Sequence, residues 1–201
     1  IESGKDMSIT ATGNGNASNI TMLNNYGDAV IKSGGDMALK SDFLLSLGNA
    51  TYQNINGEKV YVGGNENVGN SLIESGGNMV VNTGTYQQQQ VGDTYTLAKS
   101  AGEMTINATE KIETYGDLMS SGNMNLESHD RGQIDSTTQG RVASQSGKWI
   151  SGGDMNIDVE NTLFYTAKDT LTEAKGSMNV TSGSSMSHSG DLVSGGDMTL
   201  N

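Results

Sequence analysis

Apolar and polar residues alternate in short stretches along the whole chain. The stretch Met7-Ser8-Ile9-Thr10-Ala11 shows the pattern, since every second residue is apolar. A strand points successive side chains to opposite faces, so a period of two predicts strands that are buried on one face. No stretch shows the period of an amphipathic helix, and the chain is therefore predicted to be all-β.

Each alternating stretch follows a turn of small and polar residues, and turn and strand together form a repeat. Its fullest copy is residues 151–157, Ser-Gly-Gly-Asp-Met-Asn-Ile. Eight of the eleven methionines occupy the same position of this motif: Met7, Met37, Met79, Met104, Met124, Met155, Met178 and Met198. The turns of the clearest copies contain Gly35, Asp36, Gly77, Asn78, Gly153, Asp154, Gly196 and Asp197.

The repeat predicts an elongated stack in which no unit buries its apolar face alone. We expect the methionines to form its packed interior. The glycines are expected to supply positive φ at the corners, and each Asp or Asn to cap its own turn. No composition shift interrupts the pattern. Residues 1–201 are thus predicted to form a single β-helical shaft domain, a fragment of a longer protein.

A shorter period lies inside the repeat. Gly27 precedes Gly35 by eight residues, and Gly116 precedes Gly122 by six. Both steps are even, and only an even step returns the apolar side chains of a strand to the same face. Successive motif methionines are unevenly spaced along the chain, so the octad-like step is the more regular signal.

The composition suggests that one chain does not complete its own core. Leu, Ile, Val and Phe make up 37 of 201 residues, about 18%, and there is no proline. Proline is excluded from strands that are paired on both sides, so its absence fits a chain whose N–H groups are nearly all bonded. Few apolar side chains favour burial between copies of the chain, and we expect a homotrimer.

Charge and residue types argue against several kinds of chemistry. The net charge of −12 makes nucleic-acid binding unfavourable, and the absence of cysteine excludes disulfides and thiolate metal sites. His129 and His188 are interpreted as surface residues, and Trp149 as a filler of the core. The Gly-Gly-Asp turns resemble calcium-binding nonapeptides, but the second Gly-x-Asp is missing. We therefore predict no catalytic residue, metal or cofactor.

The octads and the Val-Gly units resemble the C-terminal β-helix of central spikes of contractile-tailed phages. The resemblance is carried by residues 26–40, 60–81, 91–107 and 116–126. It implies three parallel chains intertwined in a stiff prism, a non-enzymatic cell-puncturing device of the virion baseplate. Its expected partners are two further copies, baseplate and tail-tube proteins and, transiently, the host outer membrane that the extracellular tail pierces. The iron site of such tips needs His-x-His, which neither His129 nor His188 provides.

Two alternatives remain open. The first is an adhesin similar to filamentous haemagglutinins, a monomeric right-handed β-helix with about twenty residues in each coil. The intervals Met104 to Met124 and Met178 to Met198 fit it, whereas the much longer interval from Met37 to Met79 does not. The second is an enzyme on a β-helix, such as a polysaccharide lyase, for which no cleft of acidic and basic residues is evident.

Overall fold

The fold is a stack of coils built from parallel strands. The computed structural model describes residues 1–12, 22–25, 28–47, 52–55, 58–61, 70–88, 95–129, 141–145, 147–160, 163–166, 168–183 and 185–201. Every regular element in these ranges is a strand, so the all-β prediction is confirmed.

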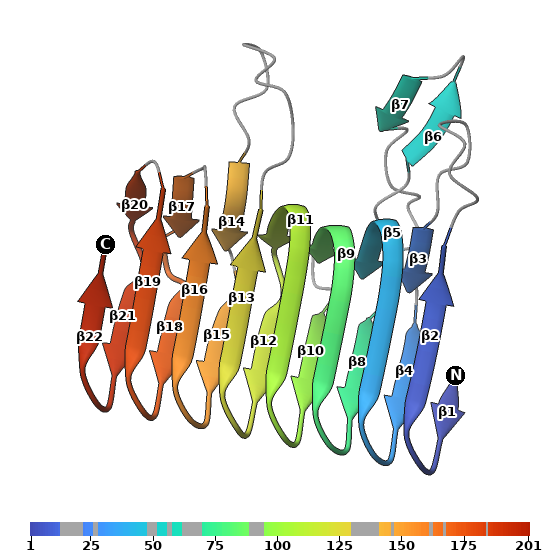
Figure 1. Ribbon diagram of the computed structural model, residues 1–201, viewed down its shortest axis with the longest axis horizontal. Helices are drawn as coiled ribbons and strands as arrows, with labels where there is room; N and C mark the ends of the chain where they lie inside the picture. Colours follow the sequence, from blue (N-terminus) through green and yellow to red (C-terminus); the bar gives the residue numbers. More distant parts are fainter. Residues whose placement is uncertain are drawn as a thin grey trace.

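Sheet A contains eight strands, which lie side by side in chain order: β1 (Glu2–Ser3), β4 (Ala29–Ser33), β8 (Ser71–Ser75), β10 (Thr96–Ser100), β12 (Asp117–Ser120), β15 (Lys148–Ser151), β18 (Leu171–Ala174) and β21 (Asp191–Ser194). Sheet B has a main path of eight further strands: β2 (Met7–Ala11), β5 (Met37–Leu47), β9 (Met79–Gln88), β11 (Met104–Thr114), β13 (Met124–Ser128), β16 (Met155–Val159), β19 (Met178–Ser182) and β22 (Met198–Leu200). Each coil crosses sheet A, turns, and returns through sheet B (Figure 1).

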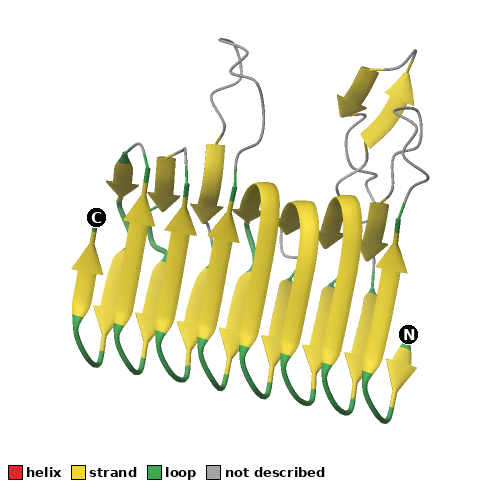
Figure 2. Ribbon diagram, in the orientation of Figure 1, coloured by secondary structure: helices red, strands yellow, loops and turns green. Residues whose placement is uncertain are grey.

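A third face extends sheet B. Strands β5, β9 and β11 are long and curve over onto this face (Figure 2). Their pairing shifts register at the bend, between Ser41 and Leu44 in β5 and between Ala108 and Lys111 in β11. A bulge of this kind bends a strand. The face is completed by four short strands: β3 (Met22–Asn25), β14 (Arg141–Gln145), β17 (Leu163–Thr166) and β20 (Met186–His188). Outside these ladders, β6 (Tyr52–Ile55) and β7 (Glu58–Tyr61) pair antiparallel.

Equivalent residues of the repeat stack directly on one another. Met124 pairs with Met104 on one side and with Met155 on the other, and every neighbouring pair of motif methionines is in register in the same way. The uneven intervals between these methionines are therefore the lengths of successive coils. The even steps of six or eight connect the strand of sheet A with the strand of sheet B in one coil. The sequence analysis favoured the step of six or eight residues over the longer intervals between methionines. That choice was wrong as a guide to which residues stack, because strand pairing joins residues far apart in sequence.

The buried side chains of the described residues form one contiguous interior between the sheets. The largest buried side chains include Trp149, Tyr86 and Leu45, and they join the motif residues in one contiguous cluster. Burying a large apolar side chain stabilises a fold by roughly 1.5–3 kcal/mol. Few such residues suffice because sheet A contributes buried serines whose hydroxyls bond to turn carbonyls, as Ser33 Oγ does to Gly35 O at 2.9 Å.

Candidate functional site

The repeated turn between sheets A and B forms one continuous edge of the molecule. We call the residue before each motif methionine the ladder position: Asp6, Asp36, Asn78, Glu103, Asn123, Asp154, Ser177 and Asp197. We call the residue before that one the slot: Lys5, Gly35, Gly77, Gly102, Gly122, Gly153, Gly176 and Gly196. All turn residues that the sequence singled out lie on this edge.

The ladder side chains bond from one coil to the next. The backbone N–H of Asp36 donates to Asp6 Oδ1 at 3.0 Å, and the N–H of Asn78 donates to Asp36 Oδ1 at 2.7 Å. Asn78, Asn123 and Asp154 accept the N–H of the following ladder residue in the same way. These side chains were expected to cap their own turns. They instead satisfy a donor of the neighbouring coil, and each such bond contributes on the order of 1 kcal/mol.

The slot glycines allow this close stacking. A Cβ atom on Gly153 would lie well inside 3.0 Å of Asn123 Oδ1, and Gly35 meets Asp6 Oδ1 in the same way. Neither glycine has the positive φ that the sequence suggested, and among the described non-glycine residues only Asp169 does. The expectation that glycine supplies a positive φ at the corners was therefore wrong at these two positions. Glycine is needed there because it leaves room for the ladder oxygen of the previous coil.

The ladder is interrupted where its residue is neither Asp nor Asn. A Cβ on Gly122 would meet Glu103 Cγ at 3.2 Å, and one on Gly196 would meet Ser177 Oγ at 2.8 Å. Asn123 compensates at the first break, because its Nδ2 donates to Glu103 Oε1 at 3.3 Å. The crowding of the slot thus depends on the ladder residue beneath it.

A second ladder follows the start of the sheet A strands. Asp28 Oδ1 accepts the N–H of Asn70 at 2.9 Å, and Asp117 Oδ1 accepts the N–H of Lys148 at 2.8 Å. The hydroxyl of Tyr95 donates to Asp117 Oδ2 at 3.1 Å. Partial burial, the charge of Asp117 and this hydrogen bond together raise the pKa of Tyr95 to about 12. The phenol therefore stays protonated far above neutral pH.

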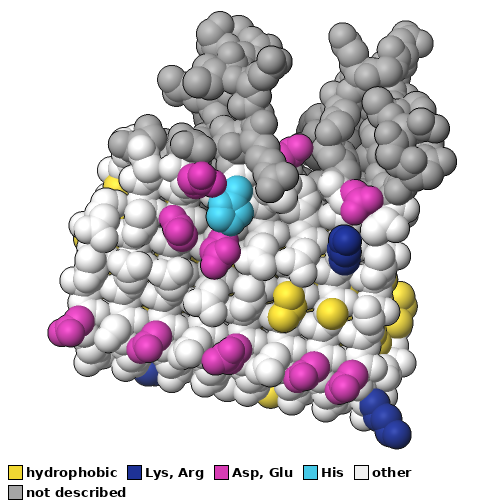
Figure 3. Space-filling view, in the orientation of Figure 1, with side chains coloured by type: hydrophobic (Ala, Val, Ile, Leu, Met, Phe, Trp, Pro, Cys, Tyr) yellow, Lys and Arg dark blue, Asp and Glu magenta, His cyan; other side chains and the backbone are white. Residues whose placement is uncertain are grey.

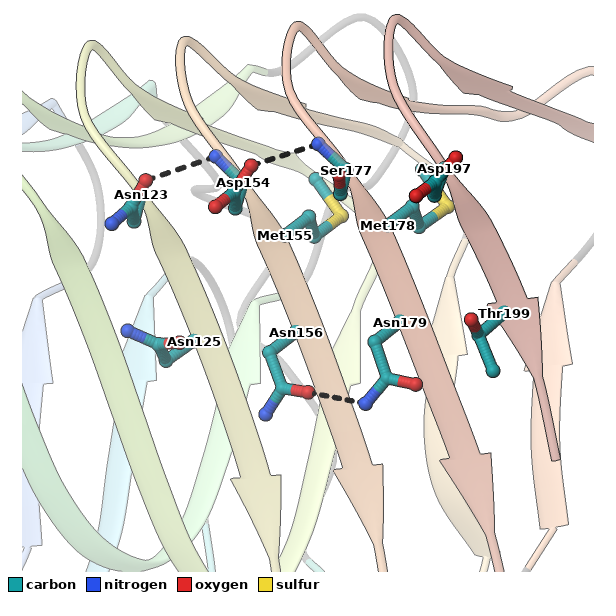
Figure 4. A pocket seen from close by; sticks show the side chains of 10 residues that line it. All are labelled: Asn123, Asn125, Asp154, Met155, Asn156, Ser177, Met178, Asn179, Asp197 and Thr199. Atoms are coloured by element: carbon teal, nitrogen blue, oxygen red, sulfur yellow. Dashed lines mark hydrogen bonds between the residues drawn. The ribbon is translucent and has the colours of Figure 1, made fainter.

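A shallow polar hollow lies beside the ladder, on the outer face of the last coils (Figure 4). Its volume is about 360 Å³, and Asn156 Oδ1 accepts a 2.8 Å hydrogen bond from Asn179 Nδ2 along its floor. The lining residues are Asn123, Asn125, Asp154, Met155, Asn156, Ser177, Met178, Asn179, Asp197 and Thr199. Amides and hydroxyls can form hydrogen bonds, but they do not exchange protons near neutral pH. Asp154 and Asp197 add two carboxylates to the lining, so the hollow offers both donors and acceptors to a polar partner.

The motif methionines lie on the opposite side of the same strands. Six of them are buried: Met37, Met79, Met104, Met124, Met155 and Met178. Met7 of the first coil is partly buried, whereas Met198 of the last coil is 41% exposed. The gradient arises because an end coil has a neighbour on one side only.

The residues considered for chemistry are dispersed. His129 lies between two carboxylates, with Nδ1 at 3.0 Å from Glu160 and Nε2 at 3.6 Å from Glu127. His188 Nδ1 contacts Thr166 Oγ1 at 2.7 Å. Trp149 is fully buried, and its Nε1 donates to Thr114 Oγ1 at 2.9 Å, so its ring is not available to stack on a glycan.

Acidic side chains follow the turn edge at the spacing of the coils (Figure 3). The ladder carboxylates among them are exposed, as Asp36 and Asp154 are. Each of these two accepts a backbone N–H, and the described residues contain no group of three or more His, Asp or Glu placed to hold a metal ion.

The sequence did not reveal two features of this edge. The outward amides Asn156 and Asn179 bond to each other across two coils, and nothing in the local sequence of either strand indicates that pairing. Asp28 and Asn70 each precede a ladder residue by eight positions in the sequence, but the bond between them joins two different coils. In both cases the bonded residues occupy equivalent positions in neighbouring coils. This correspondence becomes visible only once the coils are stacked.

The described residues include no helix that could cross a membrane. No family model, no curated protein and no solved structure matches the chain.

Proposed function

We propose that the chain is a stretch of rigid, non-catalytic shaft in an extracellular β-helical protein, of the adhesin type similar to filamentous haemagglutinins. A shaft of this kind holds other parts of its protein at a distance from the surface that bears it. The observation that carries the proposal is the stacking of motif methionines, in register and buried, inside a single chain.

The adhesin interpretation gains from the location of the core. A trimeric spike was expected because a chain poor in apolar residues needs sister chains to complete its interior. One chain already encloses a contiguous cluster, including Trp149 and Tyr86, so this argument for three chains no longer applies. The unequal coil lengths were an argument against an adhesin with about twenty residues in each coil. The structure keeps the methionines in register even across the longer coils, so that argument is weakened.

The bonding pattern suits a load-bearing element. Parallel ladders join each coil to the next in both sheets, and the ladder bonds from Asp36 and Asp154 add connections at the turn. These bonds run from coil to coil along the stack. Separating two coils therefore breaks many hydrogen bonds together, which is what a shaft under tension or bending requires.

The stoichiometry in solution tests the proposal. Size-exclusion chromatography with light scattering should give one chain of 21.0 kDa at micromolar and lower concentrations. Small-angle X-ray scattering on the same sample should give an elongated, folded particle. A stable particle of three times the single-chain mass would contradict the monomeric shaft and support the central-spike function instead.

A further inference from the structure

The outer faces of the two sheets differ in polarity. Among the described residues, few hydrophobic side chains reach the outer face of sheet B, which Figure 3 shows. The outward residue that follows each motif methionine in the middle coils is polar: Thr105, Asn125, Asn156 and Asn179. Apolar inward and polar outward residues are the pattern of a strand with one face in water. The outer face of sheet B therefore suits contact with solvent.

Sheet A alternates in the same way but has a different outer face. In β10, β12, β15 and β18 the inward residues are buried, and the outward residues are partly or fully exposed. Half of these outward residues are apolar, and Met119 and Ile150 lie side by side in the middle of the face. Apolar side chains that gather on an exposed face mark an interaction surface.

Strand register arranges the outward residues of these four strands in two rows across sheet A. The first row is Leu97, Asp117, Lys148 and Leu171. The second row is Lys99, Met119, Ile150 and Glu173. In the reverse direction, each row has its apolar residues in the same places and its charges exchanged in sign. A contact between two identical surfaces requires this property, because each surface must complement itself.

We propose that two copies of the chain associate through this face of sheet A, with antiparallel stacks related by a two-fold axis that runs along the strands between β12 and β15. Each row then faces the same row of the second copy in reverse order. Met119 packs on Ile150 of the second copy, and Lys99 faces the Glu173 carboxylate of that copy. Asp117 likewise faces Lys148. Opposite charges at these places favour this register over the others.

The size of the face makes this a weak contact. Strands lie about 4.8 Å apart and rise about 3.3 Å per residue, so four strands of four residues cover on the order of 20 by 13 Å. A stable interface buries roughly 800 Å² on each partner, so we expect a dissociation constant on the order of 100 μM or weaker. The chain stays monomeric at micromolar concentration, as the proposed shaft requires. Shafts held close together on one surface reach higher local concentrations, at which they associate side by side.

A charge exchange tests the two-fold register. Lys99→Glu places two carboxylates opposite each other at both symmetry-related positions. In sedimentation equilibrium up to millimolar concentration, this variant should associate on the order of tenfold more weakly than the unchanged chain. Adding Glu173→Lys restores opposite charges and should restore the association. Lys99 and Glu173 lie on β10 and β18, which are separated by β12 and β15 in one chain, so the recovery reports a contact between copies.

A second pair of variants tests the apolar centre of the face. Ile150→Asp should abolish association, because it places a carboxylate against Met119 of the second copy. Val80→Asp is the matched control, since Val80 is 36% exposed on the outer face of sheet B and the variant gains the same charge. It should associate as the unchanged chain does. Circular dichroism of all variants should show the same fold, because the substituted side chains point outward.

Three results would overturn the proposal. The first is an unchanged chain that stays monomeric throughout the concentration series, which would leave the proposed shaft function intact. The second is a double variant of Lys99→Glu and Glu173→Lys that associates no more tightly than Lys99→Glu alone. The third is an equal loss of association in Ile150→Asp and Val80→Asp, which would show that added charge, and not the face of sheet A, controls the contact.

Discussion

At the scale of the residue, the crowding of a slot is set by the ladder side chain beneath it, and this can be measured. Gly153→Ala places a methyl group against Asn123 Oδ1, which also accepts the N–H of Asp154. Overpacking costs typically 1–3 kcal/mol, and a lost acceptor adds to it, so we expect a destabilisation of about 2 kcal/mol or more.

Gly122→Ala is the matched control, because its nearest side-chain atom is Glu103 Cγ at 3.2 Å. Its cost should stay within about 1 kcal/mol, since alanine also reduces the entropy of the unfolded chain. Urea unfolding of the two variants makes the comparison. Equal losses would show that backbone stacking, and not the ladder oxygen, makes glycine necessary in the slot.

The direction of a side chain can be predicted from the sequence, but its bonding partner in another coil cannot. The period of two correctly indicated which side of Met155 and Ile157 faces inward, because strand geometry alone decides it. The roles of Gly153 and Asp154 were misassigned to their own turn. Their true partners belong to the neighbouring coils, and local spacing contains no information about such contacts.

At the scale of the element, one coil should be removable. Deleting residues 155–177 takes out β16, β17 and β18 and joins Asp154 to Met178. Met124 then faces Met178, and Gly196 receives the ladder oxygen of Asp154 as Gly176 does in the intact chain. We expect a folded protein whose urea m-value falls by roughly one eighth, because m scales with the surface exposed on unfolding.

The control deletion keeps Met155 and removes residues 156–177. This one-residue shift turns the amide of Asn179 inward and the apolar set outward, which should prevent the coil from packing. Far-ultraviolet circular dichroism and urea titration distinguish the two proteins. Loss of the fold in both would mean that neighbouring coils are not interchangeable.

The sequence predicts that the elements are strands, but it does not predict which strands pair with one another. The turn and the apolar triplet predicted the strands of sheet B, whereas the long coil between Met37 and Met79 obscured their pairing. In the apolar run Phe43 to Leu47, Leu44 and Leu45 are buried in succession, which breaks the alternation that a strand would show. They follow the register shift of β5, where the strand turns onto the third face.

At the scale of the whole molecule, low apolar content is a poor guide to burial. The core of a globular domain is several side chains thick and needs many large apolar residues. The interior of each coil here is narrow and is enclosed by single strands, so fewer large side chains fill it. Buried hydroxyls such as those of Ser75 and Ser151 occupy much of sheet A and bond to turn carbonyls. A composition rule calibrated on globular domains therefore underestimates the interior of a stack.

A stack also predicts how stability is distributed. Each coil contacts only its neighbours, so a central coil has two stabilising interfaces and an end coil has one. Leu118 and Met124 in the fifth coil are fully buried, while Met198 and Leu200 in the last coil are not. Local opening should thus begin at the ends and move inward. Amide hydrogen exchange followed by mass spectrometry should show protection in β12 and β13 about a hundredfold or more above that in β21 and β22. Uniform protection would instead mean that all coils open in one cooperative step, and the nearest-neighbour description would then fail.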